Sequence, residues 1–163
     1  MRGASGQKSL LPIWDSATVR VVRRSLHDEL LALAREYGVD AVYVFGSRAD
    51  EIVGRLRGLE APARPASDVD IGILPRRGTR LTARDRVRLA AKLEDLLGVG
   101  RVDLVVLPEA SAFLAVDVIQ GGLLVDLDPD RTAEFELYVL RRAGDLLGFE
   151  RQRVEAVLGK GAR

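Results

Sequence analysis

The sequence predicts a single α/β domain. Short runs rich in β-branched residues alternate with longer segments in which apolar residues recur every three or four positions. The length of 163 residues suits one domain, and 47% hydrophobic with 30% charged residues is typical of a globular chain. We therefore expect one hydrophobic core built from helices and strands in alternation.

The first elements follow from local signals. Residues 1–13 are polar and are predicted to form a flexible N-terminal tail, which leaves residues 14–163 as the domain. Asp15 or Ser16 can cap the first helix, and Gly38 is placed to end it. The predicted elements up to the middle of the chain are a helix over 16–37, a buried strand over 41–45, a short helix over 48–58, a loop over 60–66 and a strand over 68–74.

The second half of the chain has similar punctuation. Thr82 followed by Asp85 resembles a capping box, and Asp128-Pro129 resembles a helix cap followed by a first-turn proline. Gly144 and Gly148 are candidate breaks in the last helix. The predicted elements are a helix over 82–97, a strand over 102–107, a helical stretch over 108–120, a strand over 123–126 and a helix from 129 to about 158.

Composition narrows the chemistry. The chain has no cysteine and one histidine, His27, so thiolate zinc sites, disulfides and a Ser-His-Asp triad are not expected. A bound metal would have to be held by oxygen, which favours Mg²⁺, Mn²⁺ or Ca²⁺. The net charge is +1 and no apolar run reaches the roughly 20 residues of a membrane span, so we expect a cytoplasmic protein without direct nucleic-acid or membrane binding.

Three aspartates are candidate catalytic and metal-ligating residues. Asp68 and Asp70 are two residues apart on a predicted strand, so their carboxylates face the same side. Asp103 lies in an otherwise apolar strand, where an acid costs desolvation free energy unless something compensates for it. If the two strands are neighbours, the three carboxylates converge. The plainer alternatives are acids at strand ends and an Asp103 solvated by the Gly100-Arg101 loop.

Gly46-Ser47 is a candidate phosphate-binding turn. It stands where the predicted buried strand over 41–45 gives way to a turn and then to a helix. Glycine permits close approach of a ligand to the backbone, and N–H groups at a helix start bind phosphate. A single Gly-Ser after a strand is common, so this feature gains weight only with its neighbours.

In this order, Val44-Phe-Gly-Ser-Arg48, Ser67-Asp-Val-Asp-Ile-Gly-Ile-Leu74 and Arg101-Val-Asp-Leu-Val105 resemble the minimal members of the DNA polymerase β-like nucleotidyltransferase superfamily. The resemblance implies a small mixed sheet of about four strands flanked by helices, with long N- and C-terminal helices. One departure is the 20 residues that separate Ser47 from Asp68, a spacer longer than is usual in that family.

The resemblance also implies a reaction and roles. An acceptor hydroxyl would attack the α-phosphorus of a nucleoside triphosphate, ATP, with Mg²⁺ or Mn²⁺ held by Asp68, Asp70 and Asp103. Gly46, Ser47 and Arg48 would bind the nucleotide, and Asp103 would bind a second metal or accept the proton.

Minimal members of this family are often antitoxins paired with helical HEPN toxins, and some transfer AMP to a toxin tyrosine. The resemblance therefore implies that this chain is the antitoxin of a type VII-like toxin–antitoxin pair and that its partner is a HEPN toxin. The toxin signature Arg-x4-His is absent here. Two alternatives stay open: a non-catalytic antitoxin that acts by contact, and a small-molecule adenylyltransferase that works as a homodimer.

Arginines gather after the strand that carries Asp68 and Asp70. The sequence suggests either a solvated helix face or a basic rim near the active site that docks an acidic partner. The residues are Arg76, Arg77, Arg80, Arg84, Arg86 and Arg88.

Overall fold

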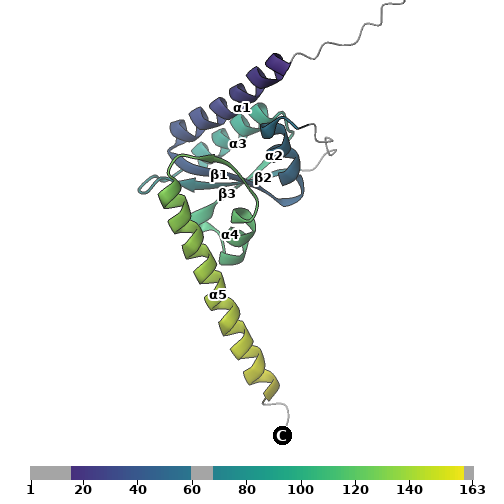
Figure 1. Cartoon of the computed structure of the whole chain (residues 1–163). Helices are drawn as coiled ribbons and strands as arrows, with labels where there is room; N and C mark the ends of the chain where they lie inside the picture. The colour runs from purple at the N-terminus through teal and green to yellow at the C-terminus, as the bar shows by residue number, and fades with distance from the viewer. Residues whose placement is uncertain (1–15, 60–67, 160–163) are drawn as a thin grey trace, which may run out of the picture.

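The computed structural model describes residues 16–59 and 68–159, with side chains for residues 26–59 and 68–148. Within these residues a four-stranded sheet lies between two layers of helices (Figure 1). The predicted tail over 1–13 and the predicted loop over 60–66 lie outside the described residues. No helix in the described part of the chain is both long and apolar enough to cross a membrane.

The sheet is mixed and has four strands, as the resemblance implied, and their order is β3-β2-β1-β4. β1 pairs antiparallel with both β2 and β4, whereas β2 and β3 run parallel. β1 is central and all seven of its residues are buried. The strands are β1 (Val39–Phe45), β2 (Val69–Pro75), β3 (Val102–Val106) and β4 (Gly122–Asp126).

The helices largely follow the predictions. Thr82 and Asp85 form the predicted capping box at the start of α3, because each side chain accepts the backbone N–H of the other residue. The helices are α1 (Ser16–Tyr37), α2 (Ala49–Arg57), α3 (Ala83–Leu97), α4 (Ala112–Ile119) and α5 (Pro129–Gly159), with short 3-10 turns η1 (Gly46–Arg48) and η2 (Leu107–Glu109).

Two predictions about helices were wrong. The stretch over 108–120 is not one helix, because Ala110 and Ser111 have extended backbones and the Ser111 side chain caps α4 by accepting the N–H of Leu114. Gly144 and Gly148 do not interrupt α5, which is continuous from Pro129 to Gly159.

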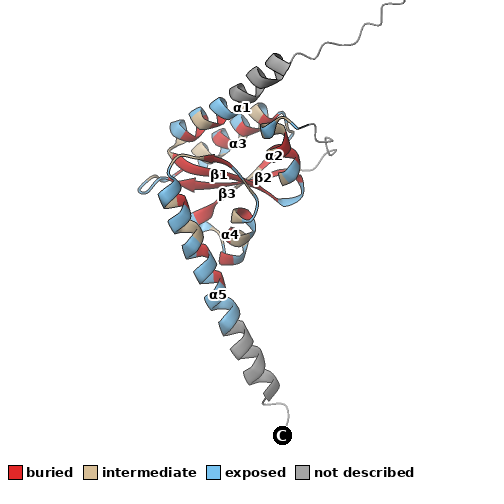
Figure 2. Ribbon diagram, viewed as in Figure 1, coloured by how far each residue is buried: buried red, intermediate tan, exposed pale blue. Residues whose placement is uncertain are grey.

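Alternating side chains of β1 serve two cores. Val42 and Val44 pack with α1, α2 and α3 on one face, whereas Tyr43 and Phe45 pack with α4 and α5 on the other. This period of two is what a strand buried on both faces requires. β1 is buried at every position and β2 at all but one, whereas β3 and β4 include partly exposed residues and the outer faces of the helices are exposed (Figure 2).

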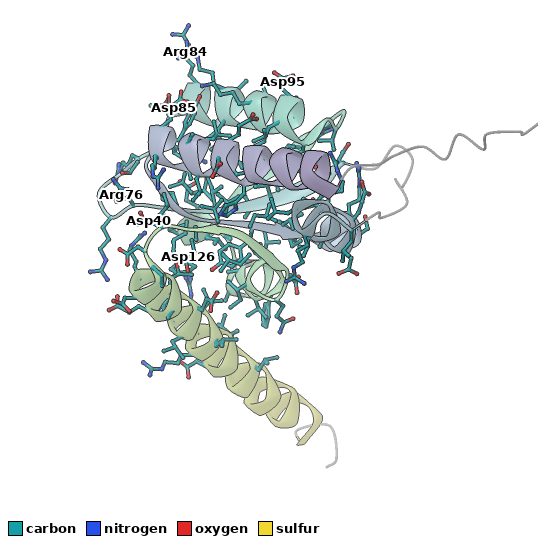
Figure 3. All side chains as sticks on the ribbon, turned by 45° about the horizontal axis from the view of Figure 1, so that its top comes forward. Asp40, Arg76, Arg84, Asp85, Asp95 and Asp126 are labelled. Carbon is teal, nitrogen blue, oxygen red and sulfur yellow. The ribbon has the colours of Figure 1, made fainter. Side chains whose placement is uncertain are left out.

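A buried aspartate ties the start of α5 to the sheet. The Asp40 side chain is only 3% exposed and accepts hydrogen bonds from Arg76 Nε at 3.2 Å and from Arg131 Nη1. The Asp40 carbonyl also accepts the N–H of Leu127. Asp40, Arg76 and Asp126 lie together beside the first turn of α5 (Figure 3). This end of the sheet is therefore held by a buried carboxylate that pairs with a largely buried Arg131 and a half-exposed Arg76.

A second polar contact holds the second turn of α5 against the sheet. Tyr43 donates a hydrogen bond from its hydroxyl to Glu136 Oε1 at 2.8 Å, and burial raises the pKa of Tyr43.

We expect Tyr43→Phe to lower the free energy of unfolding by about 1 kcal/mol, since one buried hydrogen bond is lost. Tyr138→Phe, which changes a half-exposed hydroxyl on the same helix, should cost much less. Urea unfolding measures both variants, and equal losses would contradict the role of the Tyr43 contact.

Candidate active site

The pairing of β2 with β3 brings the candidate acids together. In the parallel register Asp70 stands opposite Asp103, and Val69 stands opposite Val102. Asp68 immediately precedes β2, two residues from Asp70 and therefore on the same side. The neighbouring strands are about 4.8 Å apart, so the three carboxylates form one acidic group at the end of the sheet where β2 and β3 begin.

Gly46 lies directly against this group. Phe45 is the register partner of Asp70, and the chain then turns at Gly46 with φ +73°. A Cβ at Gly46 would lie 2.4 Å from Asp70 Oδ2, so only glycine lets the backbone approach the carboxylate this closely. Ser47 is exposed on the same turn, and α2 follows it. The structure thus brings Gly46, Ser47 and the carboxylates to the same end of the sheet.

The carboxylates repel one another. The pKa of Asp70 is raised, first by desolvation and then by the neighbouring charges of Asp103 and Asp68. An acid with a raised pKa is one whose ionised form is disfavoured, so a cation placed between these groups is strongly favoured. Carboxylate oxygens of this kind are the donors that Mg²⁺ and Mn²⁺ prefer, and the residues present therefore fit a hard divalent ion.

Arg101 supplies a positive charge beside these acids. Its guanidinium donates to Asp103 Oδ1 from Nη2 at 2.9 Å and from Nε at 3.1 Å, and its Nε lies 3.6 Å from Asp68 Oδ2. With the side chains turned this way, no group of three or more His, Asp or Glu residues among those described is arranged to hold a metal ion. A metal would have to draw the carboxylates away from Arg101.

Sequence reasoning did not identify Arg101 as part of the site. The available signal was its position two residues before Asp103, which places both side chains on the same face of a strand.

Arg48 was predicted from the sequence to bind the nucleotide. In the structure Arg48 is buried, and its guanidinium donates two hydrogen bonds to Glu51 at 2.7 and 2.9 Å, within the first turn of α2. Its charge is therefore engaged with Glu51.

Of the two interpretations of the arginines after Pro75, the basic rim near the active site is wrong. β2 leads away from Asp70, and Arg76 donates its backbone N–H to Gly38, at the opposite end of β1 from Gly46. The arginines that follow Pro75 therefore lie at the far end of the sheet from the carboxylates. These arginines follow the acids closely along the chain, but the whole length of β2 separates the two groups in space.

Beside Gly46, on the side away from the carboxylates, lies a hollow of about 470 Å³. It is bounded by α2, the end of α4 and the start of β4. Its charged side chains are Asp50, Asp117 and Arg57, so it is not strongly basic. A substrate that reaches the carboxylates across Gly46 therefore has room on the side of this glycine that faces α2 and β4.

Arg101 provides a test of the acidic group. We expect Arg101→Gln to lower the melting temperature in EDTA, because the repulsion among Asp68, Asp70 and Asp103 loses its counter-charge. Added Mg²⁺ or Mn²⁺ should then raise the melting temperature more than in the wild type. Arg88→Gln, on the exposed face of α3, is the charge-matched control. Equal metal-induced gains in all three proteins would contradict the assignment.

Comparison with solved structures supports the fold. Three toxin–antitoxin complexes contain similar chains. A complex with AMP-PNP has a chain that is 24% identical with a TM-score of 0.58, and the match covers 81% of this chain and 98% of that chain. A tri-AMPylated Shewanella oneidensis HEPN toxin with an MNT antitoxin (22% identity, TM-score 0.57) and an MntA–HepT complex (22% identity, TM-score 0.56) each match over 83% of this chain and 98% of theirs. At these identities the likeness concerns the fold. A search of curated proteins gave no match.

A family model supplies the assignment. The model described as polymerase beta, nucleotidyltransferase matches residues 29–130. That stretch contains all four strands, the Gly46-Ser47 turn and the three aspartates. It covers more than half of the chain, and the residues that it spans are those that build the acidic edge of the sheet. The chain therefore belongs to the polymerase β nucleotidyltransferase family.

Proposed function

We propose that this protein transfers AMP from ATP to a hydroxyl of a partner protein, a tyrosine of a helical HEPN toxin, and so acts as the antitoxin of the pair. The observation that carries the proposal is the placement of Asp70 beside Asp103 and against Gly46. The family membership supports the reaction class, and the fold neighbours that hold AMP-PNP or an AMPylated toxin support the substrate and the acceptor. Because ATP is consumed, we place the reaction in the cytoplasm.

The reaction is a displacement at phosphorus. The acceptor oxygen forms a bond to the α-phosphorus, the bond between that phosphorus and the bridging oxygen to the β-phosphate breaks, and pyrophosphate leaves. The hydroxyl proton passes to Asp103. The accepting atom is the carboxylate oxygen of Asp103 that does not hold the divalent ion, since a bound ion would displace Arg101 from this side chain.

The chain's own residues position the reactants. The backbone of Gly46 and the N–H groups that follow it would bind the outer phosphates, and Ser47 would add its hydroxyl. The hollow beside Gly46 would receive the nucleoside. Asp68, Asp70 and Asp103 would hold a divalent ion, Mg²⁺ or Mn²⁺, which supplies charge stabilisation for the triphosphate and the leaving group when bound.

The test uses the purified chain with a HEPN toxin as the proposed partner. ATP labelled on the α-phosphate should transfer label to the toxin in the presence of Mg²⁺, whereas ATP labelled on the γ-phosphate should not. Mass spectrometry of the toxin should then locate AMP on a tyrosine. A toxin that is neutralised without ever gaining AMP would show a contact antitoxin instead. Label that appears only on a small molecule, with the chain alone, would show the homodimeric alternative.

A further inference from the structure

A basic cavity lies at the far end of the sheet from the carboxylates. It has a volume of about 490 Å³ and begins at Pro75, where β2 ends. The loop after β2, the first turns of α3 and α5, and the turn after β3 form its walls. Pro75 lies five positions after Asp70 in β2, which corresponds to roughly 17 Å along the strand. The cavity is therefore separate from the candidate active site.

The charges that line this cavity are strongly unbalanced. Five arginines face one acid, and we call this group the arginine cavity. Its charged members are Arg76, Arg77, Arg80, Arg86, Arg131 and Glu109. Guanidinium groups bind phosphate through two parallel hydrogen bonds and keep their charge at any physiological pH. A hollow with this lining attracts an anion that carries several acceptor oxygens.

Two of these arginines are positioned in advance. Arg76 and Arg131 both donate to the buried carboxylate of Asp40, which holds their guanidinium groups at the wall of the cavity. Asp40 neutralises only one of the two charges. Donors whose rotamers are already fixed lose less conformational entropy when a ligand binds, which favours affinity.

The remaining arginines can exchange their partners for a ligand. Arg77 pairs with Glu134 across the surface, with both side chains more than 60% exposed, and such pairs contribute little to stability. Arg86 holds Glu109 through two bonds of 2.6 and 2.8 Å, the two-point geometry that also suits phosphate oxygens. The pKa of Glu109 is lowered by Arg86 and, to a smaller extent, by Arg80. An oxyanion is thus already favoured here.

We propose that the arginine cavity is a second binding site that takes a small ligand bearing a phosphate or diphosphate group. Its volume lies within the range of small-molecule sites, and four separate segments of the chain enclose it. A nucleic-acid backbone needs an open groove that continues past the contact, so the concave shape favours a free phosphorylated compound. The proposal stands on the cavity and does not require the transferase activity.

Inorganic pyrophosphate in EDTA is the probe, with binding followed by titration calorimetry at low salt. Without a divalent ion the aspartates at the other end of the sheet repel this anion, so heat reports the arginine cavity. The double variant Arg77→Gln/Arg80→Gln should bind pyrophosphate at least tenfold more weakly than the wild type. Glu109→Gln, which removes the single acid from the wall, should bind it several-fold more tightly.

Arg84→Gln/Arg88→Gln is the matched control. It removes the same charge from exposed positions on α3 that do not line the cavity, and Arg84 points away from the body of the protein (Figure 3). Its affinity for pyrophosphate should stay within twofold of the wild type. Equal losses in the two double variants would reduce the effect to net charge and overturn the proposal. So would the absence of pyrophosphate binding to the wild type, or arginine-dependent binding of single-stranded RNA alone.

Discussion

Asp70→Asn is expected to abolish AMP transfer while leaving the protein folded. The substitution removes one of the carboxylates that would hold the divalent ion, and such an ion contributes several kcal/mol of transition-state stabilisation. A loss of about 4 kcal/mol corresponds to roughly 10³-fold in rate. Asp68→Asn should have a comparable effect. Transfer of label from α-labelled ATP to the toxin, under single-turnover conditions, measures it.

The stability of the same variant distinguishes chemistry from folding. The pKa of Asp70 is raised by burial and by Asp103 and Asp68, so its ionised form costs stability at neutral pH. Replacing it with a neutral amide should therefore keep or raise the melting temperature in EDTA. Asp95→Asn, on the exposed face of α3, is the control that should leave both activity and stability unchanged. Wild-type transfer by Asp68→Asn/Asp70→Asn would show that the aspartates are not catalytic.

Gly46→Ala is the second large expected effect. The new methyl group would lie 2.4 Å from Asp70 Oδ2, and the carboxylate would have to turn away to admit it. Misplacement of a catalytic group by about 1 Å can reduce a rate by roughly 10²-fold. We therefore expect transfer to fall by about two orders of magnitude, measured with the same assay.

Gly98→Ala provides a matched comparison. Both glycines have positive φ, +73° and +62°, so alanine at either position costs about 1–2 kcal/mol of backbone strain. A Cβ at Gly98, however, meets no atom within 4 Å. The two variants should lose similar stability, but only Gly46→Ala should lose activity. If Gly98→Ala loses as much transfer, the close approach to Asp70 is not what matters.

Patterns with a short range predicted most of the fold. β1 is found close to its predicted position because its β-branched and aromatic residues lie between clear breaks, and α3 begins where Thr82 and Asp85 reciprocally cap it. The convergence of Asp70 with Asp103 needed one further condition, that β2 and β3 are neighbours. The sequence left that condition open, and the parallel register of β2 with β3 meets it.

The features that the sequence did not predict depend on the direction in which β2 runs and on which partner each arginine side chain binds. The arginines from Arg76 onward are near Asp70 along the chain, but β2 carries them to the other end of the sheet. Arg48 follows the Gly46-Ser47 turn, as a phosphate-binding residue would, yet Glu51 in the next turn engages its guanidinium. Arg101 pairs with two acids whose closeness depends on the strand order. Only the short spacings Arg48–Glu51 and Arg101–Asp103 offered a local signal for these outcomes.

The residues of the candidate active site lie on strands that differ in local stability, because of the strand order. Asp70 lies on β2, and Gly46 follows β1, and both of these strands have hydrogen-bonded neighbours on both sides. Asp103 lies on β3, which pairs only with β2. In native-state hydrogen exchange, amides of β1 and β2 should exchange only through global unfolding, whereas β3 can detach in smaller openings. Each such opening removes Asp103 while Asp70 and Gly46 stay in place. A nucleotide or partner that bridges β2 and β3 would therefore slow exchange most in β3.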